Sequence, residues 1–151
     1  MKRREFLKKS SIAALSLAAV DICAKNVSGK IDFEEAYEDA VKGAKKIYKN
    51  SKKIKLKIPK DVKSGLVVPV EVDIDYPMEG DRYIEHIYIL ATKNPVANIV
   101  KANYTFINAK AYLFVNIKLS ETQEVVVLAK SNIGEIFEKR KRVKVAISGC
   151  S

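Results

Sequence analysis

The stretch GLVVPVEVDID, residues 65–75, alternates between apolar and acidic side chains with a period of two. Successive side chains of an extended chain point to opposite faces, so this pattern predicts a β-strand with one buried and one solvated face. Pro69 interrupts the pattern. Because proline donates no hydrogen bond to a neighbouring strand, it predicts a sheet edge or a bulge. The solvated face carries the acidic row Glu71, Asp73 and Asp75.

Six further segments on both sides of this stretch have strand-like patterns and are separated by turn residues. Short strands with a turn signal about every ten residues are typical of a sandwich of two sheets. The sequence therefore predicts a mainly β protein, an immunoglobulin-like antiparallel β-sandwich of about seven strands over residues 53–147. The six segments are KIKLKI (53–58), RYIEHIYILAT (82–92), ANYTFIN (102–108), KAYLFVNIKL (110–119), EVVVLAKS (124–131) and EIFEKRKRVKVAI (135–147).

A helical pattern precedes the strands. Asp32 is a helix-capping residue type, and Glu35 follows it at the spacing of a capping pair. Apolar residues then recur every three or four positions and form one stripe. We therefore expect an N-terminal helix over residues 32–50 that packs on the sandwich or on a partner. The stripe consists of Phe33, Ala36, Tyr37, Ala40, Val41, Ala44, Ile47 and Tyr48.

The first 24 residues have the order of an export signal: a basic head, a short apolar run and small residues. The pair Arg3 and Arg4 is similar to a twin-arginine (Tat) motif. The apolar run is shorter than the roughly 20 residues that a membrane span needs, and the residues before Cys23 do not fit a lipoprotein anchor. We expect a twin-arginine signal peptide over residues 1–24, with cleavage after Ala19 as the alternative, and a periplasmic protein without a membrane anchor.

Composition excludes several classes of site. The chain has 151 residues, two cysteines and one histidine, too few Cys and His ligands for a structural zinc site. Its formal charge of +10 suggests nucleic acid, but the basic run Lys139–Arg142 lacks the interleaved aromatic residues that stack on bases. Two interpretations of this run remain: its charges protect a strand edge, or they attract small anions and favour a nearby thiolate.

Two other candidate features receive structural interpretations. The acidic row could bind calcium, but neighbours on one strand face lie about 7 Å apart, and calcium ligands normally converge from a loop. A solvated sheet face is the better interpretation. His86 stands in a strand without a nucleophile motif nearby, so we assign no catalytic or metal-binding residue.

The chain ends in Ser148-Gly149-Cys150-Ser151. A structural cysteine is usually buried, whereas chain ends are seldom ordered, and Gly149 adds backbone freedom. The small residues Ser148, Gly149 and Ser151 around Cys150 predict a flexible C-terminal arm over residues 148–151 that presents a nucleophile. The alternatives are an interchain disulfide and an inert thiol. Removal of the signal peptide would also remove Cys23 and leave Cys150 as the only thiol.

An ordered set of segments from about residue 53 to Cys150 resembles the SoxY family, the sulfur-carrying subunits of the periplasmic thiosulfate-oxidising (Sox) system. The family's tail usually reads Gly-Gly-Cys-Gly-Gly, and here Ser148 and Ser151 replace two of the glycines. The matching segments are the stretch 65–75 followed by Pro77-Met78, then ILATKNP (89–95), LSETQEVVVLAKSNIG (119–134) and VKVAISGC (143–150).

The resemblance implies a carrier protein rather than an enzyme, with Cys150 as the attachment point for thiosulfate or sulfane sulfur and with no other cofactor. It implies a heterodimer with a SoxZ-like β-protein. It also implies three kinds of partner enzyme: a haem enzyme, a hydrolase and a molybdenum-haem enzyme. No nucleic-acid partner is expected.

Two functions outside this family remain as alternatives. A secreted immunoglobulin-like interaction module would use Cys150 for an interchain disulfide. A small-ligand or metal-binding sandwich would use the acidic row, and its activity would not depend on Cys150.

Overall fold

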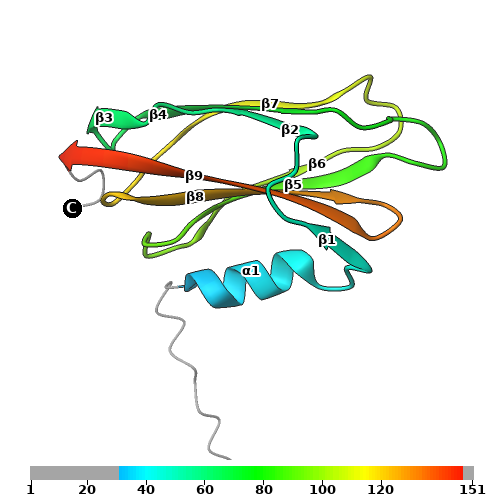
Figure 1. Ribbon diagram of the computed structural model, residues 1–151, viewed down its shortest axis with the longest axis horizontal. Coiled ribbons are helices and arrows are strands. Elements are labelled where there is room, and N and C mark those ends of the chain that lie inside the picture. The colour runs from blue at the N-terminus through cyan, green and yellow to red at the C-terminus, as the bar shows by residue number, and fades with distance from the viewer. Residues whose placement is uncertain (1–30, 148–151) are drawn as a thin grey trace, which may run out of the picture.

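The computed structural model describes residues 31–147 as two β-sheets packed face to face, with one helix outside the larger sheet (Figure 1). The larger sheet has the strand order β1-β9-β8-β5-β6, with β3 also paired to β9, and the smaller sheet has the order β2-β4-β7. The elements are α1 (Phe33–Val41), β1 (Lys46–Tyr48), β2 (Ile54–Lys57), β3 (Asp61–Ser64), β4 (Val68–Ile74), β5 (Ile84–Ala91), β6 (Asn98–Asn103), β7 (Ala111–Ile117), β8 (Gln123–Ser131) and β9 (Glu135–Ile147).

The predicted immunoglobulin-like sandwich is confirmed, but it contains nine strands in the described residues rather than about seven. The two additional strands, β1 and β3, are three and four residues long and run parallel to β9, one along each end of it. The other pairings are antiparallel. Strands this short carry no measurable alternation of their own.

One predicted strand is displaced along the chain. The sequence pattern favoured residues 102–108, whereas β6 covers Asn98–Asn103 and the chain turns after it. Thr105 and Asn108 close this turn: the Thr105 N–H donates to Asn108 Oδ1 at 2.8 Å, and the Asn108 N–H donates to the Thr105 carbonyl at 3.0 Å. This turn, closed by one side-chain and one backbone hydrogen bond, ends the strand although aromatic residues continue the apolar pattern.

The main core lies between the two sheets. The valine and isoleucine side chains of β4 all point into it, as the period of two predicted. Pro69 is exposed at a point where β2 no longer runs beside β4, since the pairing with β2 begins at Glu71. The predicted local sheet edge at this proline is therefore confirmed. The core is built from Val68, Val70, Val72 and Ile74 of β4 with Ile87, Ile89, Val125, Val127, Phe137 and Val143 of the larger sheet.

The opposite face of the larger sheet is covered by α1, so β5 and β8 are buried on both faces. Such strands have continuous apolar runs rather than alternation. Ala36 and Ala40 of the helix pack against Leu90 and Leu128 of the sheet. Asp32 caps the helix as predicted, with its Oδ1 accepting the Glu35 N–H at 3.0 Å.

The predicted helix over residues 32–50 is wrong in its second half, because α1 ends at Val41. Gly43 has a φ of +76°, which turns the chain out of the helix. The Lys45 N–H then donates to the Gly134 carbonyl at 2.8 Å, and β1 follows along the edge of β9. Tyr48, a member of the predicted helical stripe, instead stacks on Phe137 with ring centroids 5.2 Å apart.

We expect Asp32→Ala to lower the free energy of unfolding by about 1 kcal/mol, because it removes the acceptor for a helix N-terminal N–H. Urea denaturation measures this change. Asp39→Ala removes the same charge from the same helix without touching the cap, and it should leave stability unchanged or slightly higher. Equal losses in the two variants would contradict a capping role for Asp32.

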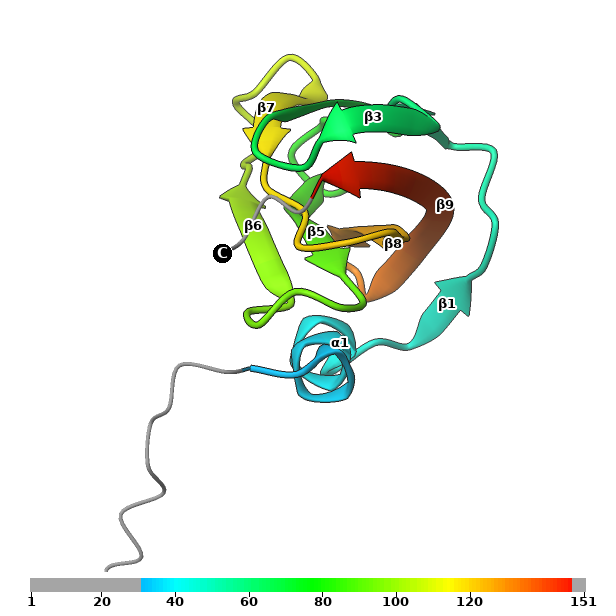
Figure 2. The ribbon, with the colours of Figure 1, turned by 90° about the vertical axis from the view of Figure 1, so that its left-hand side faces the viewer.

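The 13-residue strand β9 links the elements that matter for function. It crosses the molecule, pairs with β8 along one side and with β1 and β3 along the other, and leads to the C-terminal residues. Figure 2 looks at the end of the molecule where β9 finishes and shows the tip of β9 beside β3. In the same view α1 lies on the opposite side of the larger sheet. The sandwich thus holds the last strand along nearly its whole length.

Candidate functional site

The predicted attachment residue Cys150, its neighbours Ser148, Gly149 and Ser151, and the signal motif Arg3 and Arg4 all lie outside the described residues 31–147. The proposed signal peptide and arm lie outside them as well. The structure does describe the residues that hold the chain just before Cys150, and the site is built from these.

Two sets of hydrogen bonds fix the end of β9. The Gly65 N–H donates to the Ile147 carbonyl at 2.9 Å, next to the parallel pairing of β3 with β9. On the other side β8 stops pairing at Gln123, and the Thr122 side chain replaces it. Thr122 Oγ1 accepts the Val145 N–H at 2.9 Å and donates to the Val145 carbonyl at 3.4 Å. The chain is therefore held by the sandwich to within three residues of Cys150.

Exposed apolar side chains surround this point. Ile147 is 67% exposed, and Leu66 and Val67, which follow the Gly65 that bonds to it, are 54% and 63% exposed. We call these three residues the apolar rim. Apolar side chains clustered in solvent are typical of surfaces that contact another protein.

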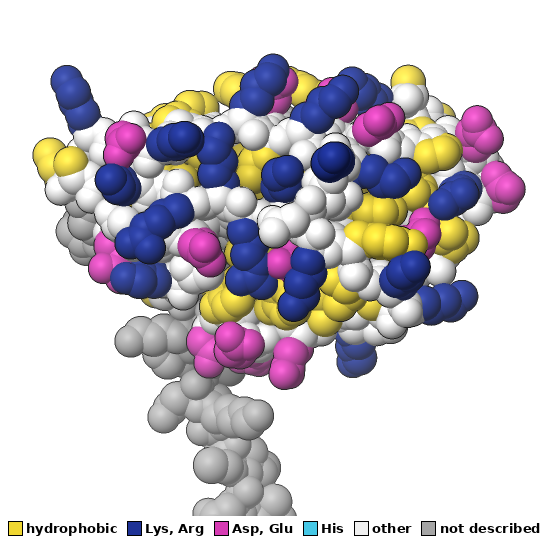
Figure 3. All heavy atoms as spheres, viewed as in Figure 1, with side chains coloured by type: hydrophobic (Ala, Val, Ile, Leu, Met, Phe, Trp, Pro, Cys, Tyr) yellow, Lys and Arg dark blue, Asp and Glu magenta, His cyan; other side chains and the backbone are white. Residues whose placement is uncertain are grey.

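A cationic groove of about 400 Å³ lies where β3 begins beside β9. Figure 3 shows that Lys and Arg side chains gather on the face crossed by β9. The sequence singled out the basic run of β9, and the structure adds Lys60 and Lys144 to it. The residues that line the groove are Lys60, Asp61, Arg140, Lys141, Arg142 and Lys144.

The acidic row lies on the outer face of the smaller sheet, as predicted. Lys57 Nζ lies 2.9 Å from Glu71 Oε1, and Lys110 Nζ lies 2.8 Å from Asp73 Oδ2. Each of these carboxylates thus has a cationic neighbour, Lys57 at the end of β2 and Lys110 just before β7. Within residues 31–147, no group of three or more His, Cys, Asp and Glu side chains is placed to hold a metal ion.

His86 takes part in local side-chain contacts. Its Nδ1 lies 2.9 Å from Asn103 Oδ1 across the β5–β6 pair, and its ring meets the Tyr88 ring edge to face at 5.8 Å. Glu85 Oε2 lies 3.8 Å from Nε2. These contacts fit the structural interpretation of this residue.

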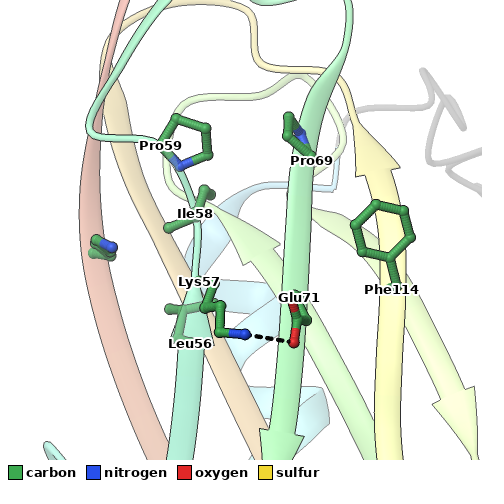
Figure 4. A pocket seen from close by; sticks show the side chains of 8 residues that line it. Leu56, Lys57, Ile58, Pro59, Pro69, Glu71 and Phe114 are labelled. Atoms are coloured by element: carbon green, nitrogen blue, oxygen red, sulfur yellow. Dashed lines mark hydrogen bonds and ion pairs between the residues drawn. The ribbon is translucent and has the colours of Figure 1, made fainter.

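A second groove, of about 370 Å³, is lined by residues of β2, β4, β7 and β9 and of the segment that follows β2. Figure 4 shows the Lys57–Glu71 ion pair joining β2 to β4, and Phe114 on the neighbouring strand β7. Its lining is mostly apolar: Leu56, Ile58, Pro59, Pro69 and Phe114, with Lys57, Glu71 and Lys141. The charges of Lys57 and Glu71 cancel in their ion pair. No nucleophilic side chain is paired with a base in the lining of this groove.

A buried carboxylate that the sequence analysis missed connects the basic strand to the helix. Glu138 of β9 is 2% exposed. Its carboxylate accepts the Arg140 Nε–H at 2.6 Å and the hydroxyl of Tyr37 from α1 at 2.5 Å. Burial by itself raises the pKa of Glu138, but the hydrogen bonds from Arg140 and Tyr37 outweigh it and leave the pKa below its ordinary value. Burial and the bond to this carboxylate raise the pKa of Tyr37 to about 12.

None of the helices in the described part of the chain is long and apolar enough to cross a membrane.

Comparison with protein families finds a match over most of the chain. The family described as "Sulfur oxidation protein SoxY" matches residues 38–150, a region that contains all the strands and ends at Cys150. A comparison with curated proteins finds no match.

Comparison with solved structures finds the same fold in proteins of more than one function. The sulfur carrier protein SoxY from Chlorobium limicola f thiosulfatophilum has a TM-score of 0.62 and 23% identity, over 76% of this chain and 96% of that one. A superoxide reductase (neelaredoxin) from Ignicoccus hospitalis has a TM-score of 0.56 and 19% identity, over 66% and 94%. The superoxide reductase from Nanoarchaeum equitans has a TM-score of 0.50 and 12% identity, over 60% and 90%. At these identities the likeness concerns the sandwich, and fold alone does not determine function.

Proposed function

The chain belongs to the SoxY family of sulfur oxidation proteins, and from this premise we propose that it carries sulfur intermediates of thiosulfate oxidation on the thiol of Cys150. The observation that carries the proposal is the family match, which extends to the near-terminal cysteine. The solved sulfur carrier protein with the same fold supports it.

The position of the cysteine relative to the sandwich is suited to a carrier. Cys150 follows Ile147, which is fixed by Gly65, by three positions in the chain. An extended chain of that length spans at most about 10 Å. The side chains of Ser148 and Gly149 are small, so this segment is thin enough to enter the channel of another protein. The sandwich would supply the fixed base and the docking surface, and the thiol would supply the attachment point.

The chemistry that we propose begins with an oxidative step at a haem partner. The Cys150 thiol and thiosulfate lose two electrons and one proton and form a cysteine S-thiosulfonate, with a new S–S bond and with the electrons passing to the haem. Thiolate is the reacting form of cysteine, and cationic residues nearby favour it. Strand β9 leads to the tail and carries several cationic side chains. Their charge supports the proposal that Cys150 reacts as a thiolate.

The remaining steps also belong to partners. A hydrolase would add water across the S–S bond to the sulfonate, which releases sulfate and a proton and leaves a persulfide on Cys150. A molybdenum-haem enzyme, where present, would oxidise this sulfane sulfur. In this scheme the chain is not itself an enzyme, and its covalently bound sulfur is its only prosthetic group.

The partners and the compartment follow from the same proposal. We propose a heterodimer with a SoxZ-like β-protein and export to the periplasm by the twin-arginine pathway. The apolar rim at Leu66, Val67 and Ile147 is a suitable contact surface for the enzymes that receive the tail, because it adjoins the last residue that the sandwich fixes.

Intact-mass measurement of the protein, isolated from cells oxidising thiosulfate, tests the proposal. We expect added mass corresponding to thiosulfonate and sulfane sulfur on the last peptide, and we expect a thiol reductant to remove it. An unmodified terminal peptide in actively oxidising cells would contradict the proposal. A permanent disulfide dimer in the active form would favour the interaction module instead.

A further inference from the structure

We propose that the cationic groove between β3 and β9 is a binding site for a sulfur oxyanion: sulfate, thiosulfate or the sulfonate end of a thiosulfonate. The identity of the ligand rests on the proposed function. The existence of an anion site rests on the charge, the backbone and the position of the groove.

The charge of the groove is not balanced by its own residues. Five cationic side chains and one carboxylate line it, a formal charge of +4, and among these cations Arg140 is the one that pairs with carboxylates outside the lining, Glu138 and Glu124. Among residues 31–147, Lys60, Lys141, Arg142 and Lys144 form no ion pair, although lysines elsewhere pair with carboxylates. Like charges held close together repel each other, and a bound anion relieves that repulsion.

Arg140 differs from the other four cations. Its Nε bonds to buried Glu138, and it lies against the rings of Phe33 and Tyr37. Its guanidinium is therefore held in place at one wall of the groove. The free cations Arg142 and Lys144 lie on the same face of β9, two and four residues further along.

The backbone beside the groove also supplies donors. The pairing of β9 with β1 ends at Phe137, and its pairing with β3 begins at Lys144. The Lys144 N–H points to this edge, since it donates to the Lys60 carbonyl at 2.7 Å. N–H groups alternate sides along a strand, so those of Arg140 and Arg142 point to the same edge, between the two short strands. Backbone N–H groups beside cationic side chains are typical of sites for tetrahedral oxyanions.

The position of the groove suits both a free anion and a carried one. Lys144 precedes Ile147 by three residues, a distance of about 10 Å along a strand. The three residues from Ile147 to Cys150 span at most a similar distance. A sulfonate attached at Cys150 can therefore reach the end of the groove from the same chain, and free thiosulfate can reach it from solution.

The first arm of the test measures free anions. Labelled full-length protein that carries Cys23→Ser is titrated with sodium thiosulfate, and with sodium sulfate, at constant ionic strength set by chloride. Amide NMR signals report the binding. We expect saturable shifts centred on Arg140, Arg142 and Lys144. The double variant Arg142→Gln/Lys144→Gln should bind about tenfold more weakly. Lys55→Gln/Lys118→Gln makes the same charge change at exposed lysines outside the groove and should bind like the parent protein.

The second arm measures a carried anion. Tetrathionate converts the Cys150 thiolate to the S-thiosulfonate and releases thiosulfate, and mass spectrometry confirms the loading. We expect the same groove signals to shift on loading, with a smaller shift in Arg142→Gln/Lys144→Gln and none in Cys150→Ser. Shifts in the first arm alone assign the groove to free anions, and shifts in the second alone assign it to the cargo. Either result supports an oxyanion site.

The site is overturned if thiosulfate, sulfate and loading all leave the groove signals unchanged, or if the groove and control variants respond alike. Aggregation of Arg142→Gln/Lys144→Gln without any anion effect would mean that these charges only protect a strand edge. Binding of an acidic partner protein without anion binding would also overturn it. Loading at Cys150 is read independently by mass, so the site can fail while the proposed function stands.

Discussion

Replacing Cys150 by serine is expected to abolish thiosulfate-dependent sulfate formation in cells that rely on this chain. A serine hydroxyl cannot form the S–S bond on which the proposed cycle depends, and no residue elsewhere in the tail has a sulfur atom to replace it. The loss should be complete rather than graded, because attachment precedes every later step. Sulfate release from thiosulfate, measured in a strain that carries only the variant, tests this expectation.

Two controls separate chemistry from folding. Cys23→Ser removes the other thiol of the chain and should retain full sulfate formation, since Cys23 lies within the proposed signal peptide. The purified Cys150→Ser protein should unfold at the same urea concentration as the parent, because residue 150 follows the last strand of the sandwich. Normal sulfate formation in Cys150→Ser would rule out the carrier function and leave the ligand-binding alternative on the acidic row.

The sequence was most informative where a strand is long and pairs with other strands along both edges. β9 was predicted with its observed bounds, 135–147, because its strand-like residues extend without a break from the turn at Asn132–Gly134 to Ile147. β1 was missed because Ile47 and Tyr48 continue the helical spacing of residues 33–44. What decides their structure is the free edge of β9 and the ring of Phe137, and neither can be seen from the local sequence.

The candidate site divides in the same way. The near-terminal cysteine and the basic run stand out in the sequence because their residue types are unusual in those places. The Glu138 network does not stand out, because Glu138 lies in a run of charged residues for which the sequence predicts exposure to solvent throughout. Only the packing of α1 across β9 shows that Glu138 is buried against Tyr37, 101 residues away in the chain. The only local signal was that Glu138 shares a strand face with buried Ile136.

The second large effect is expected at this network. Arg140→Met should lower the free energy of unfolding near neutral pH by about 3 kcal/mol, because it leaves the carboxylate of Glu138 buried with Tyr37 as its one remaining side-chain donor. Methionine keeps much of the apolar length of arginine against Phe33 and Tyr37, so the change isolates the charge. Urea denaturation measures the loss. Arg142→Met, on the same strand face without an ion pair in the described residues, should change stability by less than about 0.5 kcal/mol.

The pH dependence of the loss identifies its cause. In the parent protein the folded-state pKa of Glu138 is lowered, so its contribution to stability is full above the ordinary carboxyl pKa and disappears as the pH falls through the lower folded value. In Arg140→Met burial is no longer opposed by the guanidinium, so we expect the pKa to rise above its ordinary value and the penalty to shrink as Glu138 takes up a proton. The difference between the two proteins should therefore be largest near neutral pH and should decrease steadily on acidification toward about pH 4. A loss that stays constant over this range would assign the effect to packing of the arginine side chain and would contradict a charged Glu138 at the junction of helix and strand.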